Sequence, residues 1–201
     1  MAPAAPWVFG SASLAFVVLP QEVTSAGRTS VGFAGLVTAL TVASGIAVQP
    51  VARRIEARRR LAGNVAGLGC AVAGAAGATV AVTSASRAGA IGCAVAFGLA
   101  YGLCLVSGLR ECERLAGRRE HGAVVACYYA LTYLGFGAPY LMAGLNSALG
   151  RAAAFAVAAA AAAVTAVWTA AFTRGSRPVP VAVKTPGAAP GPRVRGSGIN
   201  R

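Results

Sequence analysis

The sequence predicts an all-α, polytopic membrane protein built from six transmembrane helices. Two observations predict this: a composition too apolar for a soluble domain, and six long apolar segments separated by short, mostly basic ones. Of the 201 residues, 57% are hydrophobic and 11% are charged, whereas soluble domains carry about 25% charged residues. Five acidic and eighteen basic residues are too few to cover a soluble globule of this length.

Six segments are apolar enough to cross a hydrocarbon core about 30 Å thick, which takes roughly 20 helical residues. The last five contain no Asp, Glu, Lys or Arg, as expected when such a residue at mid-membrane costs about 3 kcal/mol. The segments are too long, and alternate too little, for the strands of a membrane β-barrel. They cover residues 6–21, 30–49, 61–83, 88–109, 122–145 and 152–173.

The first segment is the shortest, and an alternative interpretation exists for it. A secretory signal with a cleavage site near residues 24–26 also fits a short apolar run followed by small residues. Such a signal begins with a basic region, and the flank MAPAAP has no basic residue. Under either interpretation the second span starts outside the cell.

The basic residues predict the orientation. Five Arg follow the second span, four follow the fourth span, and six basic residues lie in the tail 174–201. The opposite side holds Arg28, Arg87 and Arg151. The positive-inside rule therefore predicts a cell-membrane protein with both termini and both basic loops in the cytoplasm. The tail is rich in Pro, Gly and Arg and is predicted to be disordered.

Several functions are not expected from this sequence. The net charge of +13 lies in short clusters between apolar segments rather than on a soluble scaffold, so nucleic-acid binding is not predicted. A single His and the absence of CxxC, HExxH and GxxxxGK[ST] predict no metal, no cofactor and no enzymatic activity. Glu111 and Glu113 are expected to pair with Arg residues of the basic loops.

Small residues recur four apart in the third and fourth segments. They are Gly63 and Gly67, then Ala94, Gly98 and Gly102. Such rows allow membrane helices to approach closely. A chain this rich in Ala and Gly also contains such rows by chance.

Three segments resemble the major facilitator superfamily. They are GIAVQPVARRIEARRR (45–60), AYGLCLVSGLRECERLA (100–116) and YYALTYLGFGAPYLMA (128–143). The resemblance is to the C-terminal half, helices seven to twelve, of bacterial drug-efflux carriers. It implies that Gly45, Arg53 and Arg54 belong to the cytoplasmic gate, although the family's acidic residue is missing near Gln49. The alternative is that the Arg cluster serves only orientation.

An aromatic stripe is the most distinctive local feature. At about 100° per residue, Tyr129, Tyr133, Phe136 and Tyr140 fall on one helix face. The resemblance implies that this face, with Tyr101 of the fourth span, borders a central cavity and binds substrate. The alternative is packing between helices, with Tyr140 in an interfacial aromatic belt.

The function that these features predict is secondary transport of a small molecule by alternating access, with efflux as the expected direction. The chain then supplies one six-helix half, and its partners are the lipid bilayer, the substrate, and either a second half or a second copy. Two alternatives stand beside it: a non-transporting six-span protein and an inactive fragment of a longer carrier.

Overall fold

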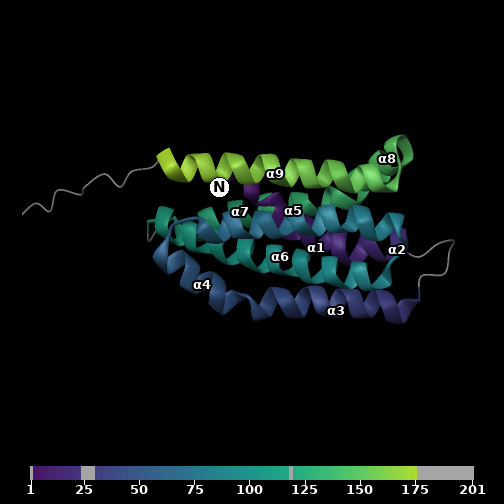
Figure 1. Cartoon of the computed structure of the whole chain (residues 1–201). Helices are drawn as coiled ribbons and strands as arrows, with labels where there is room; N and C mark the ends of the chain where they lie inside the picture. The colour runs from purple at the N-terminus through teal and green to yellow at the C-terminus, as the bar shows by residue number, and fades with distance from the viewer. Residues whose placement is uncertain (1, 24–29, 118–119, 176–201) are drawn as a thin grey trace, which may run out of the picture.

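The computed structural model describes residues 2–23, 30–117 and 120–175, and this part is helical apart from short turns. No strand occurs in it, which confirms the predicted all-α class. Figure 1 shows the long helices side by side in one bundle. The elements are η1 (Ala2–Ala4), α1 (Pro6–Ser13), η2 (Leu14–Val18), α2 (Leu19–Val23), α3 (Val31–Ala47), α4 (Gln49–Arg58), α5 (Ala62–Thr83), α6 (Arg87–Leu115), α7 (His121–Tyr133), η3 (Leu134–Gly137), α8 (Ala138–Leu149) and α9 (Arg151–Gly175).

Five helical segments of the described chain are long and apolar enough to cross a membrane. They match the last five predicted spans, and they support a membrane-embedded protein. The count of six spans remains a prediction, as does the disorder of the tail, since residues 176–201 lie outside the described part. The proposed cleavage site near residues 24–26 lies outside it as well. The five segments are Val31–Arg58, Ala62–Thr83, Arg87–Leu115, His121–Leu149 and Arg151–Phe172.

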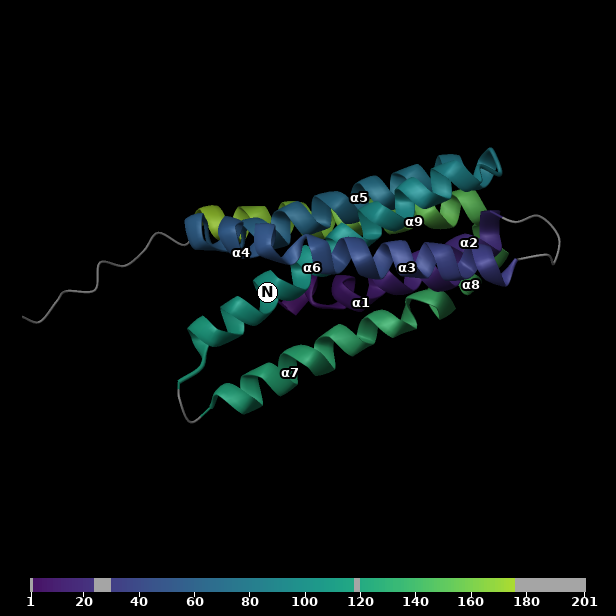
Figure 2. The same cartoon turned by 90° about the horizontal axis from the view of Figure 1, so that it is seen from below.

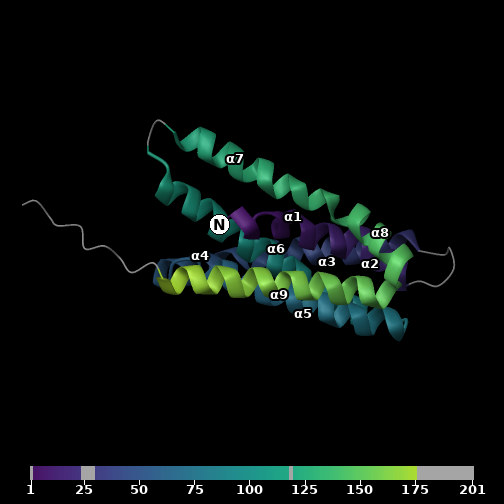
Figure 3. The same ribbon diagram turned by 90° about the horizontal axis from the view of Figure 1, so that it is seen from above.

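The first predicted span is helical over Pro6–Val23 and lies in the interior of the bundle. Val8, Ala15 and Leu19 are each 0% exposed, and Figure 3 shows α1 between α7 and α9. Its two small hydroxyl residues, Ser11 and Ser13, are buried too. The two serines lower the hydropathy of this segment, although it is the segment that the other helices surround.

Glycines allow α3 and α5 to approach the backbone of α6. A Cβ at Gly98 would collide with the Thr41 carbonyl, and one at Gly102 would collide with the carbonyl of Gly45. On the other side of α6, a Cβ at Gly67 would lie 2.6 Å from the Cys104 Sγ. The rows of small residues seen in the sequence therefore lie at helix contacts, where they permit the dispersion packing that holds membrane helices together.

Three of the long segments depart from a regular α-helix next to a proline. Val48 ends α3, and Pro50 occupies the first turn of α4, where a missing N–H costs nothing. The π-helical turn η2 precedes Pro20, and the 3-10 turn η3 precedes Pro139. A proline in a helix frees a carbonyl of the preceding turn, and a local change of helical pitch accommodates that loss. Before Pro139 this change of pitch is the turn η3.

Two helices continue beyond the predicted span limits at the basic end. The Arg-rich segment after the second span, expected to be a loop, forms α4 as far as Arg58, with Ala52 and Glu56 buried. Likewise α6 extends from the predicted limit at residue 109 to Leu115, with Glu111 and Cys112 buried. Buried positions on one face of each extension show that packing, rather than hydropathy, sets these helix ends.

Glycine-to-alanine changes on α6 should separate close packing from helix propensity. Gly98→Ala is expected to lower the free energy of unfolding by about 1–3 kcal/mol, because the added Cβ meets backbone that cannot rotate away. Gly92→Ala lies on the same helix with nothing within 4 Å, so propensity alone should leave stability equal or higher. Thermal unfolding in detergent, followed by tryptophan fluorescence, measures both. Equal midpoints for the two variants would contradict this account.

Candidate functional site

Four aromatic rings from three segments of the bundle form a stack at its side. Phe9 of α1 stacks on Phe136 at 4.8 Å and on Tyr133 at 5.4 Å between ring centroids. Tyr101 of α6 lies 6.1 Å from Phe9, and Tyr133 lies 5.9 Å from Phe136. We call these four residues the aromatic wall. Tyr133 is 57% exposed and Phe136 44% exposed, so the wall presents ring faces and a phenol to its surroundings.

Two close crossings position the aromatic wall. At the first, a Cβ on Gly135 would collide with the backbone of Pro6 and Gly10, so η3 lies directly on α1. At the second, Gly45 of α3 lies against the Tyr101 ring, where an added Cβ would be 2.6 Å from Cδ1. Gly45, predicted as part of a gate, thus contacts Tyr101, predicted as part of the substrate cavity.

The predicted aromatic face is only partly assembled. Tyr101, Tyr133 and Phe136 come together, whereas Tyr129 is half-buried in an edge contact with Tyr128 at 6.2 Å. Tyr140 is 84% exposed on α8 and shows no ring contact in the described chain. The 3-10 turn η3 lies between Tyr133 and Tyr140 and interrupts the α-helical spacing from which the shared face was predicted, because a 3-10 residue turns by about 120° rather than about 100°. Tyr140, in α8 beyond this turn, does not join the stack.

Two aromatic residues of this region escaped the sequence analysis. Phe9 lies in the shortest of the six predicted segments, where no pattern in the sequence indicated that it is the centre of the stack. Tyr128 is 7% exposed, and its hydroxyl donates to the Cys104 carbonyl at 3.1 Å. Its ring lies on Gly108 of α6, so Tyr128 joins α7 to α6. Gly108 was the one sequence feature that could have indicated this contact, because a large ring packs against a helix where a glycine leaves room for it.

Four charged residues form a second constellation at the basic end of the bundle. Arg60 donates from Nε to both Glu111 carboxylate oxygens, at 2.9 and 3.0 Å, and its Nη2 pairs with Glu111 as well. Arg114 Nη1 lies 3.6 Å from Glu111 Oε2 and 3.8 Å from Glu56 Oε2. Both carboxylates are only 1% exposed. We call Glu56, Arg60, Glu111 and Arg114 the charge cluster.

Glu56 also builds the turn between α4 and α5. Its carboxylate accepts the Leu61 N–H at 3.1 Å and the Gly63 N–H at 2.9 Å. It therefore caps the start of α5, where a negative charge is favoured by the helix dipole. Leu61 adopts a left-handed conformation with φ 59°, a strained geometry that these hydrogen bonds help to hold. One buried carboxylate thus fixes the turn, while Arg114 connects it to α6.

Two predictions concerned charged residues at this end of the bundle. The expected pairing of Glu111 with loop arginines is confirmed, whereas Glu113 is exposed. Arg53 and Arg54, the predicted gate residues, are exposed on α4 and make no ion pair within the described chain, and their role in a gate stays a prediction. The hydrogen bonds that Arg60 donates to the Glu111 carboxylate raise the pKa of the Arg60 guanidinium further above its ordinary value. Arg60 therefore keeps its charge at every physiological pH.

A smaller polar contact joins the opposite end of the bundle. Glu22 at the end of the first segment accepts from Asn146 Nδ2 at 2.9 Å. Arg151, the first residue of α9, donates from Nη1 to the Glu22 backbone oxygen at 3.1 Å. Its Nε lies 3.9 Å from the Glu22 carboxylate, and its side chain is 53% exposed. These three residues, the terminal clasp, join α2, α8 and α9.

Comparisons with known proteins identify no relative. No family model matches the chain, and neither a curated protein nor a solved structure matches it. The described geometry therefore carries the functional argument alone.

Neutralising a buried carboxylate should separate the charge cluster from ordinary surface charge. Glu111→Gln is expected to lower the free energy of unfolding by about 2 kcal/mol, because Arg60 and Arg114 lose a charged acceptor. Glu113→Gln, two residues away and exposed, should change it by no more than about 0.5 kcal/mol. Thermal unfolding of both variants in the same detergent provides the comparison. A Glu111→Gln protein as stable as wild type would show that the cluster does not hold this end together.

Proposed function

We propose that the chain is one six-helix half of a secondary transporter that moves a small amphipathic molecule by alternating access. The observation that carries the proposal is the aromatic wall, which collects four rings from α1, α6, α7 and η3 around Phe9. A Tyr ring that faces lipid leaves its hydroxyl without a hydrogen-bond partner, and a Tyr hydroxyl out of water usually has one. Rings facing a cavity stack on a ligand and offer it that hydroxyl.

The chemistry of the aromatic wall supports an uncharged or weakly polar substrate. No Asp, Glu, Lys or Arg occurs in the apolar segments that carry Tyr101, Tyr133 and Phe136. A multiply charged solute would lose its hydration there without gaining an ionic partner. The wall offers ring faces and two phenols, which fit a molecule with an apolar body and a polar edge.

The charge cluster supports a gate at the cytoplasmic end of the bundle. It ties α4, the start of α5 and the end of α6 together through ion pairs on two buried carboxylates. The carboxylates are buried while Arg60 and Arg114 are partly exposed, and removing the partner of a buried charge is costly. Such a cluster therefore favours two discrete arrangements, paired or apart, over continuous bending. We assign the gate to these four residues, and we assign Arg53 and Arg54 to orientation in the membrane.

A carrier also needs a second wall opposite the aromatic wall, and α3 and α7–α8 offer the surface for it. Both segments expose large apolar side chains, among them Leu36 and Ile46 on α3 and Leu134 and Leu141 on η3 and α8. Figure 2 shows α7 diverging from the rest of the bundle. A second six-helix half or a second copy of the chain would cover this side. The transport test below distinguishes this proposal from the two alternatives, a non-transporting membrane protein and an inactive fragment.

The proposed topology predicts which single cysteines react in intact cells. In a chain whose five native cysteines are replaced by Ala, Arg58→Cys should resist a membrane-impermeant maleimide until the membrane is opened. Ser84→Cys, at the opposite end of α5, should react from outside in intact cells. Labelling at 58 but not at 84 would reverse the orientation, and labelling at both would exclude the membrane-spanning arrangement.

Removing rings from the aromatic wall should abolish transport. Phe9→Ala and Tyr101→Ala are expected to return retention of an amphipathic fluorescent dye, such as Nile red, to within about twofold of cells lacking the protein, because each loses stacking area at the wall. Tyr140→Ala, outside the wall and 84% exposed, should behave as wild type. Dye retention is measured at matched membrane levels of all variants.

The outcomes separate the proposed function from its rivals. Lower dye retention with the wild-type chain alone would favour a homodimer that completes its own cavity. Lower retention only when a second six-helix half is co-expressed would favour a split carrier. If retention is unchanged in both settings while the protein reaches the membrane normally, the chain is not a transporter of such molecules.

A further inference from the structure

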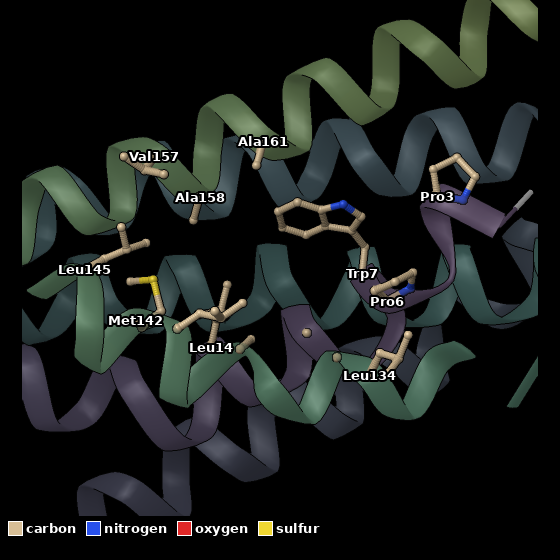
Figure 4. A pocket seen from close by; sticks show the side chains of 14 residues that line it. Pro3, Pro6, Trp7, Leu14, Leu134, Met142, Leu145, Val157, Ala158 and Ala161 are labelled. Atoms are coloured by element: carbon tan, nitrogen blue, oxygen red, sulfur yellow. The ribbon is translucent and has the colours of Figure 1, made fainter. Parts of the chain in front are cut away.

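An apolar groove with a volume of about 360 Å³ opens on the side of the bundle between α1, α8 and α9. Figure 4 shows Trp7 and Leu14 along its floor, with α9 on one side and the η3–α8 segment on the other. This groove is separate from the aromatic wall, although α1 contributes to both. Its principal lining residues are Trp7, Leu14, Met142, Leu145, Ala158 and Ala161.

The groove exists because small residues face one another across it. Gly10 and Gly135 bring α1 and η3 together at one edge, while Ala158 and Ala161 leave the α9 side without bulk. The indole N–H of Trp7 is already satisfied, since it donates to Thr165 Oγ1 at 3.2 Å. Water needs two or more polar partners in a cavity, and the side chains of the residues that line this groove are apolar apart from the Trp7 indole N–H. The groove therefore suits an apolar occupant.

The position and length of the groove point to a lipid chain. Its rim residues Leu141 and Val157 are 71% and 41% exposed, and they continue into the exposed apolar face of α9 at Val164. From Leu134 to Leu145 the lining extends over about 17 Å at 1.5 Å per residue. One leaflet of the hydrocarbon core is about 15 Å deep. A single acyl chain thus matches the groove in both chemistry and length.

A positive charge stands beyond one end of the groove. Leu145 lies one helical turn before the end of α8, and Arg151 begins α9 just after it. The Arg151 side chain is 53% exposed, and its contacts with Glu22 engage Nε and Nη1. A guanidinium has further N–H donors, and phosphate is the group that its geometry suits. By the predicted orientation, this end faces the outer leaflet.

We propose that the groove binds one acyl chain of an outer-leaflet phospholipid whose phosphate contacts Arg151. The proposal rests on the membrane embedding proposed above but not on transport. The bound chain fills space between span five and span six, so it acts as a structural part of the bundle.

The two tryptophans of the chain provide the test. The full chain is reconstituted in vesicles of phosphatidylglycerol with acyl chains brominated near their midpoint, which quench indole fluorescence on contact. With Trp168→Phe, the remaining Trp7 should be quenched. Adding Ala161→Leu should reduce that quenching by about half or more, because the larger side chain occupies space in the groove that the acyl chain would otherwise fill. Ala160→Leu, on the exposed face of α9 outside the lining, is the matched control and should change nothing.

A second measurement identifies the occupant. Native mass spectrometry of the detergent-purified full chain should show one retained phospholipid on wild type and on Ala160→Leu, and less on Ala161→Leu and Arg151→Gln. The proposal is overturned if Trp7 is not quenched or if Ala161→Leu leaves the quenching unchanged. It is also overturned if the bound mass is that of a fatty acid, another small molecule or a second copy of the chain. Trp168, 60% exposed on α9, is measured in Trp7→Phe, and lack of quenching there would instead disprove the membrane embedding.

Discussion

The arrangement of this bundle depends on backbone contact between helices at glycine. In lipid no hydrophobic force draws apolar helices together, so close dispersion packing has to hold them. Gly98 and Gly102 supply it between α6 and α3, and Gly135 supplies it between η3 and α1. The same crossings bring Phe9 beside Phe136 and set the Tyr101 ring against Gly45. The residues that allow the helices to pack therefore also build the aromatic wall.

The helices could be predicted where their positions depend on the local sequence, and less well where they depend on contacts with neighbouring helices. Runs of about 20 uncharged residues mark the last five segments because charge is costly in lipid. The central place of Pro6–Val23 depends on which helices surround it, and its Ser11 and Ser13 even dilute its apolar signal. The helical extension through Arg58 depends on the burial of Ala52 and Glu56. Whether the helical pitch widens, as before Pro20, or tightens, as before Pro139, cannot be read from the prolines alone.

The candidate site could be predicted only where its residues lie on one face of a single helix. Tyr133 and Phe136 lie close together as their spacing predicts, whereas Tyr140, beyond the 3-10 turn that contains Phe136, does not join them. Phe9 belongs to a segment more than a hundred residues before Tyr133 in the sequence. The spacing of residues along one helix therefore could not predict its place in the stack. The same holds for the charge cluster: Arg60 and Glu111 are 51 residues apart, and they meet through the register of α5 on α6. A general preference of Glu111 for loop arginines was visible, but the choice of Arg60 and Arg114 was not.

The two ends of the bundle are held with different strength, and this difference bears on the proposed mechanism. At the basic end, the side chains of Arg60 and Arg114 are 54% and 39% exposed, but Glu56 and Glu111 are only 1% exposed. A carboxylate buried in this way is stable only while its partners stay in place. At the opposite end, the Glu22 carboxylate is 21% exposed and the Arg151 side chain 53%, so water replaces a lost partner at little cost. Separating the terminal clasp is therefore easier than separating the charge cluster. In a carrier half with the predicted orientation, this asymmetry favours the state that is closed toward the cytoplasm and open toward the outside.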